Sequence, residues 1–443
     1  MIRRMAAAAV VVTALGLAAG VAGAVNGSTK KPTKITVWVG FLPSTHELKV
    51  LKRLIAEYDK KTPNVEVEVD GGIRDPKIIA AIRSGNPPDV VSSFASSNVG
   101  TFCSTGAWID LGPLLKTSHI STSIFPKASQ YYTQYKGVRC ALPMLADDFG
   151  LYYNKDLFRQ AGITRPPKTF SELTAYAKKL TQKNADGSFK VVGYDPASAF
   201  YDDQPPKYTF YAPLYGAKYT DAKGHSSLAK NPGWTKYFRW QKNLIDWYGW
   251  DKLRRFQSGL GQEFSASNAF ETGQLAMNID GEWRVAFIEN EHPKLNYGTA
   301  PMPVDDAHPE LYGAGYINGT IIGIPKGVKH KDEAWALVKY LATDTHFLAQ
   351  FSNGIRNVPS TIASAKSPEI KPDKHFATFL KIFANPHSNT TPITAVGGGY
   401  QDLIQTFAVK WQAGHVKDLS GGLKNVDRQI DEQLAQATKG GKP

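Results

Sequence analysis

The stretch ITVWVGFLPSTHELKVLKRLIAEYDKKTPNVEVEV, residues 35–69, decides the fold class. Its first five residues are apolar and rich in β-branched side chains, which is typical of a strand buried in a parallel sheet. An amphipathic helix is predicted next, with apolar residues at helical spacing from Leu51 to Tyr58 and an end near Pro63. Valines then alternate with glutamates over residues 65–69, as in a half-exposed strand. A strand–helix–strand unit of this kind predicts an α/β fold with a parallel sheet.

The same alternation continues along the chain. Strands are predicted at 89–92, 150–153, 275–279 and 320–324, and a late helix is predicted from about Asp332. The pairs Ser44 with Glu47 and Thr169 with Glu172 have the spacing of capping boxes at helix starts. At 443 residues the chain is too large for one compact core, so two globular domains are expected.

The first residues have the layout of a secretory signal. Arg3 and Arg4 precede an uncharged stretch that closes with small residues at 22–24, which predicts a signal peptide over residues 1–24 and a polar linker over 25–34. The apolar stretch is also long enough to span a bilayer, so an uncleaved membrane anchor is the competing interpretation. Removal of the signal lowers the formal net charge of +13 by two.

Charge and cysteine content narrow the possible partners. Lys and Arg are spread along the chain and interrupted by acids, which indicates a solvated surface and predicts no nucleic-acid partner. Cys103 and Cys140 are 37 positions apart, and export into an oxidising compartment predicts that they form a disulfide, with two buried thiols as the alternative. This spacing does not fit a zinc site, so no metal is expected.

No catalytic motif of a common class occurs in the sequence. Gly-x-Ser-x-Gly, His-Glu-x-x-His and Walker patterns are all missing, and no cofactor is predicted. Asp147 and Asp148 could be the acid and base of a glycosidase, or one of the two could act with Glu282. Neighbours on a strand point to opposite faces, however, so a single ligand-facing carboxylate is the preferred interpretation. Aromatic residues near turns suit stacking on sugar rings, although isolated aromatic residues are often part of a core.

A series of segments in a fixed order resembles one known family. They are ITVW (35–38), AAIRSGNPPDVV (80–91), LYYNKDLF (151–158), AGI (161–163), PKTFSEL (167–173), FETGQLAM (270–277), GEW (281–283), GIPKG (323–327) and EAWALVKYL (333–341). In this order the chain resembles the extracellular solute-binding proteins of ABC importers, in the carbohydrate-binding group that includes maltose-, multiple-sugar- and glycerol-phosphate-binding proteins. The likeness covers nearly the whole chain after the signal.

The resemblance implies two α/β lobes that close by hinge motion over a ligand cleft. Matching motifs assign residues 35–146 plus 289–328 to the first lobe and 147–288 plus 329–437 to the second, with a flexible tail at 438–443. The implied function is capture of a sugar or oligosaccharide outside the cytoplasm and delivery to the membrane permease, by a monomer without enzymatic activity. Alternatives are a glycerol phosphodiester, another polyol or an oligosaccharide-like antibiotic as ligand, and a secreted glycan-processing enzyme.

The resemblance also implies where the ligand binds. Trp283 in the Gly-x-Trp turn is the strongest candidate, with a place in the core as its alternative. For Glu47 the alternative is the capping-box role. Asp89 is assigned a structural role, and no lipid-attachment cysteine is present because Gly20 and Val21 stand where it would be. The full set of candidates is Phe41, Glu47, Ser93, Phe94, Ser96, Asp147, Asp148, Trp283, Tyr316, Asn318, Arg356 and Tyr400.

Overall fold

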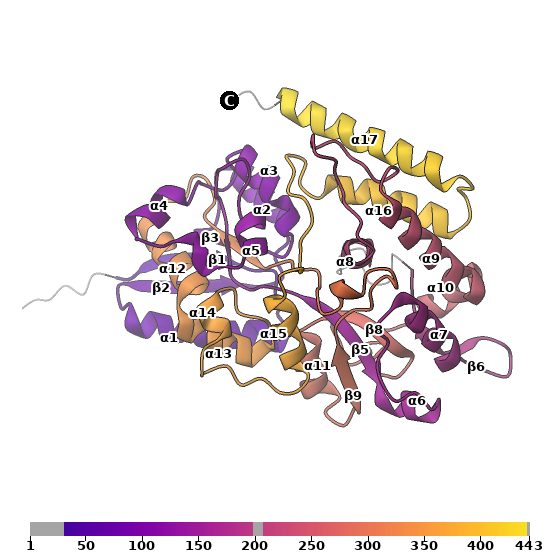
Figure 1. Cartoon of the computed structure of the whole chain (residues 1–443). Helices are drawn as coiled ribbons and strands as arrows, with labels where there is room; N and C mark the ends of the chain where they lie inside the picture. Colours follow the sequence, from indigo (N-terminus) through magenta and orange to yellow (C-terminus); the bar gives the residue numbers. More distant parts are fainter. Residues whose placement is uncertain (1–30, 198–206, 441–443) are drawn as a thin grey trace, which may run out of the picture.

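The computed structural model describes residues 31–197 and 207–440, and these form two lobes side by side (Figure 1). Each lobe is built around a five-stranded sheet with helices packed against it. The α/β prediction is therefore confirmed. The predicted signal peptide and most of the linker, up to residue 30, lie outside the described residues. Among the described helices, none is long and apolar enough to cross a membrane.

The sheet of the first lobe has the strand order β2-β1-β3-β10-β4. β1 pairs in parallel with β2 and β3, whereas β10 runs antiparallel to β3 and β4. The predicted strands at 35–39, 65–69, 89–92 and 320–324 all lie in this sheet. The strand bounds are β1 Thr33–Trp38, β2 Val65–Asp70, β3 Val90–Ser93, β4 Leu142–Pro143 and β10 Ile321–Gly323.

Two faces of this sheet are buried by different helices. One core is formed by β1 with α1 (His46–Lys61), α12 (Lys331–Thr343) and α13 (Thr345–Ile355). Strand β1 contributes Ile35 and Val37 to it, and the next residue after the strand contributes Val39. Val91 of the neighbouring β3 faces the opposite core. Other helical segments of this lobe are α2 (Asp75–Arg83), η1 (Ser96–Asn98), α3 (Val99–Ser104), α4 (Gly112–Thr117), η2 (Thr122–Ile124), α5 (Lys127–Tyr132) and α14 (Ile362–Ala365).

The sheet of the second lobe has the strand order β6-β7-β8-β5-β9. β7 and β8 are parallel, and β5 is antiparallel to both of its neighbours, β8 and β9. The predicted strands at 150–153 and 275–279 correspond to β5 and β8. The strand bounds are β5 Phe149–Asn154, β6 Gln182–Lys183, β7 Phe189–Tyr194, β8 Leu275–Gly281 and β9 Tyr297–Ala300.

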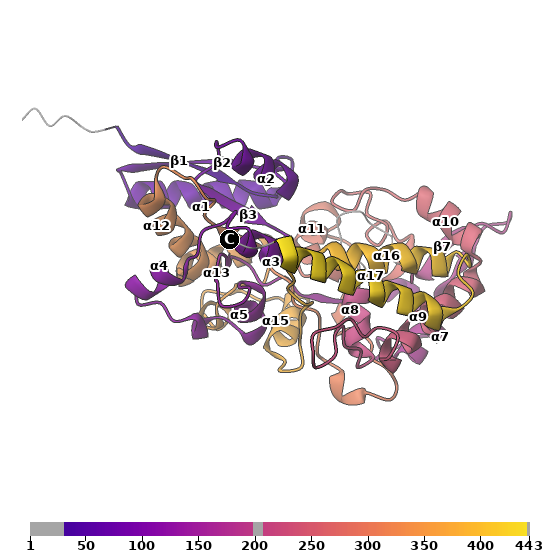
Figure 2. The same ribbon diagram turned by 90° about the horizontal axis from the view of Figure 1, so that it is seen from above.

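Helices from three parts of the chain surround the second sheet. The predicted cap at α7 is confirmed, because the Thr169 hydroxyl accepts a hydrogen bond from the Glu172 amide. Figure 2 shows α16 and α17 lying along this lobe. The bounds are α6 Lys155–Gln160, α7 Phe170–Leu180, α8 Lys207–Leu214, α9 Pro232–Tyr248, α10 Trp250–Ser258, α11 Arg284–Glu291, η3 Pro309–Leu311, α15 Phe376–Ala384, α16 Gly399–Gln412 and α17 Leu419–Gly440.

The lobe boundaries predicted for the later half of the chain are wrong in part. Strand β10 lies in the first lobe and α15, α16 and α17 lie in the second, as expected, whereas β9, α12 and α13 do not lie where they were expected. The stretch 289–328 was expected in the first lobe, but its strand β9 pairs with β5 in the second sheet. The stretch 329–437 was expected in the second lobe, yet α12 and α13 bury their apolar faces in the core of the first. The predicted tail is also wrong up to residue 440, because α17 extends to Gly440; residues 441–443 lie outside the described part.

The chain changes lobes between β4 and β5, between β9 and β10, and over the stretch between α13 and α15, in which residues 356–361 lie at the junction. Three segments lie against one another at this junction. The amide of Ala146 donates to the carbonyl of Val358 at 3.0 Å, and the amide of Asn318 donates to the carbonyl of Asp147 at 2.8 Å. A junction in which the backbone crosses between the lobes several times is typical of proteins whose domains move by hinge bending.

The predicted disulfide between Cys103 and Cys140 is confirmed. Their Cα atoms are 5.4 Å apart, within the usual range for a disulfide. The bond joins α3 to the segment that precedes β4, so both cysteines lie in the first lobe. It ties the chain together just before the first crossing between lobes.

Candidate functional site

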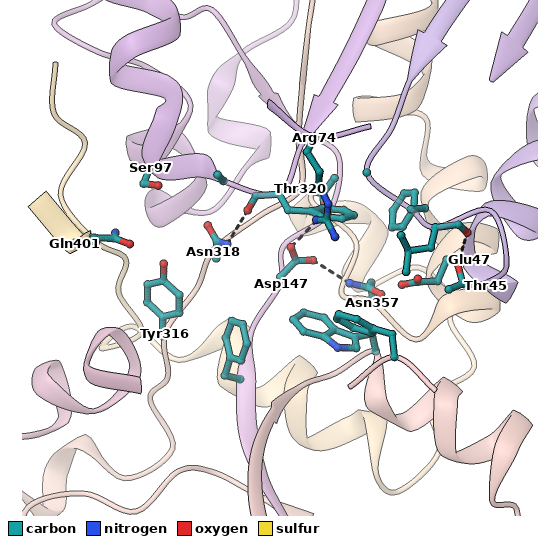
Figure 3. A pocket seen from close by; sticks show the side chains of 18 residues that line it. Thr45, Glu47, Arg74, Ser97, Asp147, Tyr316, Asn318, Thr320, Asn357 and Gln401 are labelled. Carbon is teal, nitrogen blue, oxygen red and sulfur yellow. Dashed lines mark hydrogen bonds between the residues drawn. The ribbon is translucent and has the colours of Figure 1, made fainter. Parts of the chain in front are cut away.

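A cavity of about 320 Å³ lies between the two lobes (Figure 3). The first lobe, the second lobe and the three crossing segments each contribute side chains to its wall. It is lined by Gly40, Phe41, Leu42, Thr45, Glu47, Arg74, Phe94, Ala95, Ser97, Asp147, Phe149, Phe264, Trp283, Tyr316, Asn318, Thr320, Asn357 and Gln401. Seven of the twelve predicted site residues are in this set: Phe41, Glu47, Phe94, Asp147, Trp283, Tyr316 and Asn318.

The aromatic wall of the first lobe comes from the loops that follow β1 and β3. The rings of Phe41 and Phe94 meet edge to face with their centroids 5.3 Å apart. Gly40 makes this possible, because a Cβ atom there would be only 2.6 Å from the Phe94 ring. The guanidinium carbon of Arg74 lies 5.4 Å from the centre of the Phe94 ring, which places a cation on that ring.

Glu47 lines the cavity and is not part of a cap of α1. The helix begins at His46, and its N-cap, Thr45, makes no capping hydrogen bond with its side chain and donates instead to the Leu42 carbonyl at 2.9 Å. The capping box predicted for Ser44 and Glu47 is therefore wrong. Desolvation, reinforced by the nearby Asp147 carboxylate, raises the pKa of Glu47 to about 7.

Asp147 occupies the floor of the cavity, at the first crossing between lobes. Its carboxylate accepts hydrogen bonds from the Asn357 side-chain amide at 2.9 Å and from the Thr320 hydroxyl at 3.3 Å. Each of these partners comes from a different crossing segment. Burial raises the pKa of Asp147 to about 6, partly offset by these hydrogen bonds. The floor therefore joins the three crossing segments through one polar cluster.

Trp283 forms the wall of the second lobe, in the turn between β8 and α11. Its ring lies against Gly281, where a Cβ atom would be 2.2 Å from the indole, and meets the Phe149 ring edge to face at 5.3 Å. The glycine of the Gly-x-Trp motif is thus required, because any side chain at residue 281 would overlap the Trp283 ring. The indole Nε1 is buried, and no hydrogen-bond acceptor within reach is found in the described part of the chain.

A buried ion cluster fixes this turn. Arg284, the next residue along, donates to Asp280 at 2.8 Å and to Glu271 at 2.9 Å, and lies 3.8 Å from Glu263. Burial alone would lower the pKa of Arg284, but these three carboxylates raise it above its ordinary value. The cluster joins the turn to the loop that carries Phe264, another lining residue. It therefore positions two aromatic side chains of the cavity wall.

Five predicted residues do not line the cavity. The Ser93 hydroxyl donates a hydrogen bond to Asp75 within the first lobe, and the Ser96 hydroxyl donates one to the side-chain oxygen of Asn318 at the junction. Tyr400 is buried, and its hydroxyl donates to the Pro392 carbonyl at 3.0 Å. Arg356 forms a two-pronged ion pair with Glu289 of the second lobe, with N–O distances of 3.1 and 3.2 Å. Asp148 is fully buried behind the floor, as expected for the strand neighbour of Asp147.

The carboxylate of Glu282 has a structural role. It accepts hydrogen bonds from the backbone amides of Asp148 at 2.9 Å and Val358 at 3.3 Å, which ties the Trp283 turn to two crossing segments. Burial, together with the nearby Asp148 and Asp147, raises the pKa of Glu282 well above its usual range. Because Glu282 is fully buried and lies outside the cavity lining, the suggested acid–base pair does not face a common ligand.

Several lining residues were not predicted. They include Thr320, the first residue of the strand predicted at 320–324. Segments without a distinctive spacing of their own contribute Arg74, Phe149, Phe264, Asn357 and Gln401. Asn357 could have been found from its position beside the predicted Arg356, and Phe149 from its place one residue after the Asp pair. Asp89 has the predicted structural role, since it accepts hydrogen bonds from the Thr36 amide and hydroxyl at 2.9 and 3.1 Å. In the described residues, no group of three or more potential metal ligands is present.

Comparisons with known proteins agree with this architecture. The chain is 24% identical over 387 residues to the maltotriose-binding protein of Pyrococcus abyssi, covering 84% of this chain and 76% of that protein. It is 25% identical over 340 residues to a maltooligosaccharide ABC transporter solute-binding lipoprotein of Streptococcus pneumoniae, covering 73% and 72%. The structure of CpMnBP1 with mannotriose bound matches with a TM-score of 0.78 and 28% identity, over 89% of this chain and 99% of that one.

The family model described as bacterial extracellular solute-binding protein matches residues 53–378, well over half of the chain. Members of this family and the relatives named above are binding proteins and not enzymes, so the glycan-processing alternative is wrong. The fold of the two lobes matches that of the CpMnBP1 structure over 89% of this chain. The chain belongs to the bacterial extracellular solute-binding proteins.

Proposed function

We propose that the chain binds a sugar in the cavity between its lobes and delivers it to the membrane subunits of an ABC importer. The observation that carries this proposal is the pairing of aromatic walls with a polar floor in one cavity. Phe41 and Phe94 come from the first lobe, Trp283 comes from the second, and Asp147 belongs to the first crossing between the lobes. Aromatic faces pack against the C–H faces of sugar rings, while hydroxyl groups require polar partners close by.

The floor supplies the hydrogen-bonding groups. The Asp147 carboxylate has acceptor capacity beyond its bonds with Asn357 and Thr320, and the buried side-chain oxygen of Asn357 has no donor within reach among the described residues. The indole N–H of Trp283 is a donor without an acceptor there. A sugar hydroxyl both donates and accepts, so it can satisfy groups of either kind. A purely apolar ligand would leave all of them buried and unpaired.

Ligand binding and lobe closure follow from the same geometry. Because the aromatic walls belong to different lobes, a ligand that touches both is bound better when the lobes are close together. Closure around the sugar would then be the signal that the permease recognises. The names of the relatives from Pyrococcus abyssi and Streptococcus pneumoniae, which refer to maltotriose and to an ABC transporter for maltooligosaccharides, support this assignment.

A neutral ligand suits the cavity better than an anion. Glu47 and Asp147 present two carboxyl groups, whereas Arg74 is the one cationic side chain among the described lining residues and already lies over Phe94. A phosphate group would meet repulsion from the acids in a poorly solvated space. We therefore favour a neutral sugar over the glycerol phosphodiester alternative. That alternative has support from a relative in Shigella dysenteriae that is named for binding sn-glycerol 3-phosphate.

The location and state of the mature protein belong to the same proposal. Residues 1–24 would direct export, and the protein would act outside the cytoplasm as a monomer, either released or held by an uncleaved signal. The family to which the chain belongs is extracellular, which supports this location. Its protein partner would be the permease.

A thermal-shift panel tests the proposal. Purified residues 25–443 would be heated with neutral mono- and disaccharides, with polyols and with glycerol phosphates. A ligand present at a hundred times its dissociation constant should add about 2.7 kcal/mol of stability. A response confined to neutral sugars supports the proposal. A response to glycerol phosphates, with none to any sugar, would contradict the proposed ligand class.

A further inference from the structure

The cavity has a contact between the two lobes at each of two ends. Figure 3 places Thr45 and Glu47 at one side of the cavity and Ser97 and Gln401 at the other, with Asp147 between them. The floor is closed by the three crossing segments, which are joined through the Asp147 cluster. What closes the two ends therefore decides how long a ligand can be.

Aromatic rings from both lobes meet at the end near Glu47. The ring of His46, at the start of α1, packs edge to face on Phe287 of α11 with the centroids 4.9 Å apart. Phe287 is 1% exposed, and its ring lies 5.7 Å from that of the lining residue Phe264. A continuous group of rings, His46–Phe287–Phe264, thus joins the first lobe to the second beside the cavity.

At the opposite end, residues 391–398 precede α16 and lie against the first lobe; we call them the strap. The Thr101 hydroxyl of the first lobe donates to the Ala395 carbonyl at 3.1 Å, and the Gly398 amide donates to the Asn98 side chain at 3.2 Å. The strap approaches α3 so closely that a Cβ atom on Gly100 would lie 1.8 Å from the Thr394 carbonyl oxygen. It leads directly into α16, which carries the lining residue Gln401.

The size of the cavity agrees with a short ligand. Its volume of about 320 Å³ lies at the lower end of the roughly 300–1,000 Å³ that small-molecule sites span. A long oligosaccharide needs a cleft that continues past at least one end of the site. Here the ring group would have to separate, or the strap would have to leave α3, before a chain of sugars could extend beyond the cavity.

We propose that the ligand is a mono- or disaccharide, and that the His46–Phe287 contact and the strap exclude longer chains. This inference rests on the proposed sugar-binding function. It distinguishes this chain from a receptor for extended oligosaccharides, because the limit on length is set by contacts between the lobes at both ends. The aromatic walls then pack against the faces of one or two sugar rings, and the contacts at the two ends leave no room for a third ring.

Calorimetric titration with two series of increasing length tests the proposal: mannose, mannobiose and mannotriose, and glucose, maltose, maltotriose and maltohexaose. In the series that binds, we expect the tightest binding at one or two rings and at least tenfold weaker binding at three. Trisaccharide binding as tight as that of the disaccharide would overturn the length limit and leave sugar binding intact. Failure of all these sugars, in a preparation that responds to glycerol phosphates, would instead contradict the proposed function and the length limit with it.

The variant His46→Ala opens one end without touching the lining residues. It should bind the trisaccharide at least tenfold more tightly than the native protein does, while its affinity for the shorter ligand changes less than threefold. Trp247→Ala, which removes a ring that is 44% exposed on α9 of the second lobe, is the matched control and should keep the native length preference. An unchanged length preference in His46→Ala would overturn the assigned role of this contact.

Discussion

The residue at which α1 begins determines the role of Glu47. Because α1 begins at His46, the carboxyl group lies in the first helical turn but faces the cavity instead of capping the helix. Its surroundings are poorly solvated, and a second carboxylate, Asp147, lies near. Such a group resists ionisation in the folded protein and not in the unfolded chain.

The stability of the protein should therefore depend on the ionisation of Glu47. Its folded pKa of about 7 lies above the ordinary 4.5, so the folded state binds the proton more tightly. This favourable term is present below about pH 4.5 and is lost as the pH rises through about 7. Glu47→Gln removes this dependence on pH. The free energy of unfolding of the variant, minus that of the native protein, should therefore be about 1–2 kcal/mol higher at pH 8 than at pH 4, after allowance for partial exposure.

Unfolding followed by circular dichroism across this pH range, without ligand, checks the expectation. Glu57→Gln is the matched control, because Glu57 lies on the same helix and pairs with Arg53 at 2.9 Å near the surface. It should follow the native pH profile. Identical profiles for Glu47→Gln and Glu57→Gln would show that the cavity does not perturb Glu47.

Elements of secondary structure were predicted from the sequence more reliably than their assignment to lobes. The strand-helix-strand unit at 35–69 and the strands β5, β8 and β10 follow directly from local apolar patterns. Strand β9 has only four residues, two of them Gly298 and Thr299, and carries little local signal. Its pairing with β5 is a long-range contact, and missing it moved the second crossing to the wrong place.

Site residues show the same limit. Phe41, Phe94 and Trp283 could be predicted because they follow strands or stand in a recognisable turn. Arg356 and Tyr400 lie near the site along the chain, yet they serve an ion pair with Glu289 and a hydrogen bond to Pro392. Which side of a loop faces the cavity depends on packing between distant segments, and no local pattern encodes it.

The strap depends on the absence of a side chain at Gly100. In Gly100→Ala, the new methyl group would overlap the Thr394 carbonyl, so α3 and the strap must move apart. We expect a loss of about 1–3 kcal/mol in the free energy of unfolding. In the control Gly259→Ala, the Cβ atom would be 3.6 Å from its nearest neighbour, an ordinary contact. Urea unfolding compares the two; equal stabilities would contradict the close docking of the strap.

At the scale of the whole molecule, the disulfide stabilises one lobe only. Cys103 and Cys140 close a loop of 37 residues within the first lobe. On the chain-entropy view, breaking this bond should cost about 3–4 kcal/mol of stability. Thermal unfolding by calorimetry, with and without reductant, should show the first lobe melting at a lower temperature while the transition of the second lobe is retained. A uniform shift of both transitions would contradict independent lobes.

We propose that the cavity between the lobes binds the sugar, and replacing Trp283 tests this assignment with a single side chain. Its ring lines the cavity and rests on Gly281 and Phe149. The decisive measurement is calorimetric titration of the best-binding saccharide into native protein, Trp283→Ala and the surface control Trp247→Ala. We predict that Trp283→Ala weakens binding about tenfold to a hundredfold, or about 1.4–2.8 kcal/mol, with little change in Tm. Native affinity in Trp283→Ala, or an equal loss in Trp247→Ala, would contradict the assignment of the cavity as the sugar site.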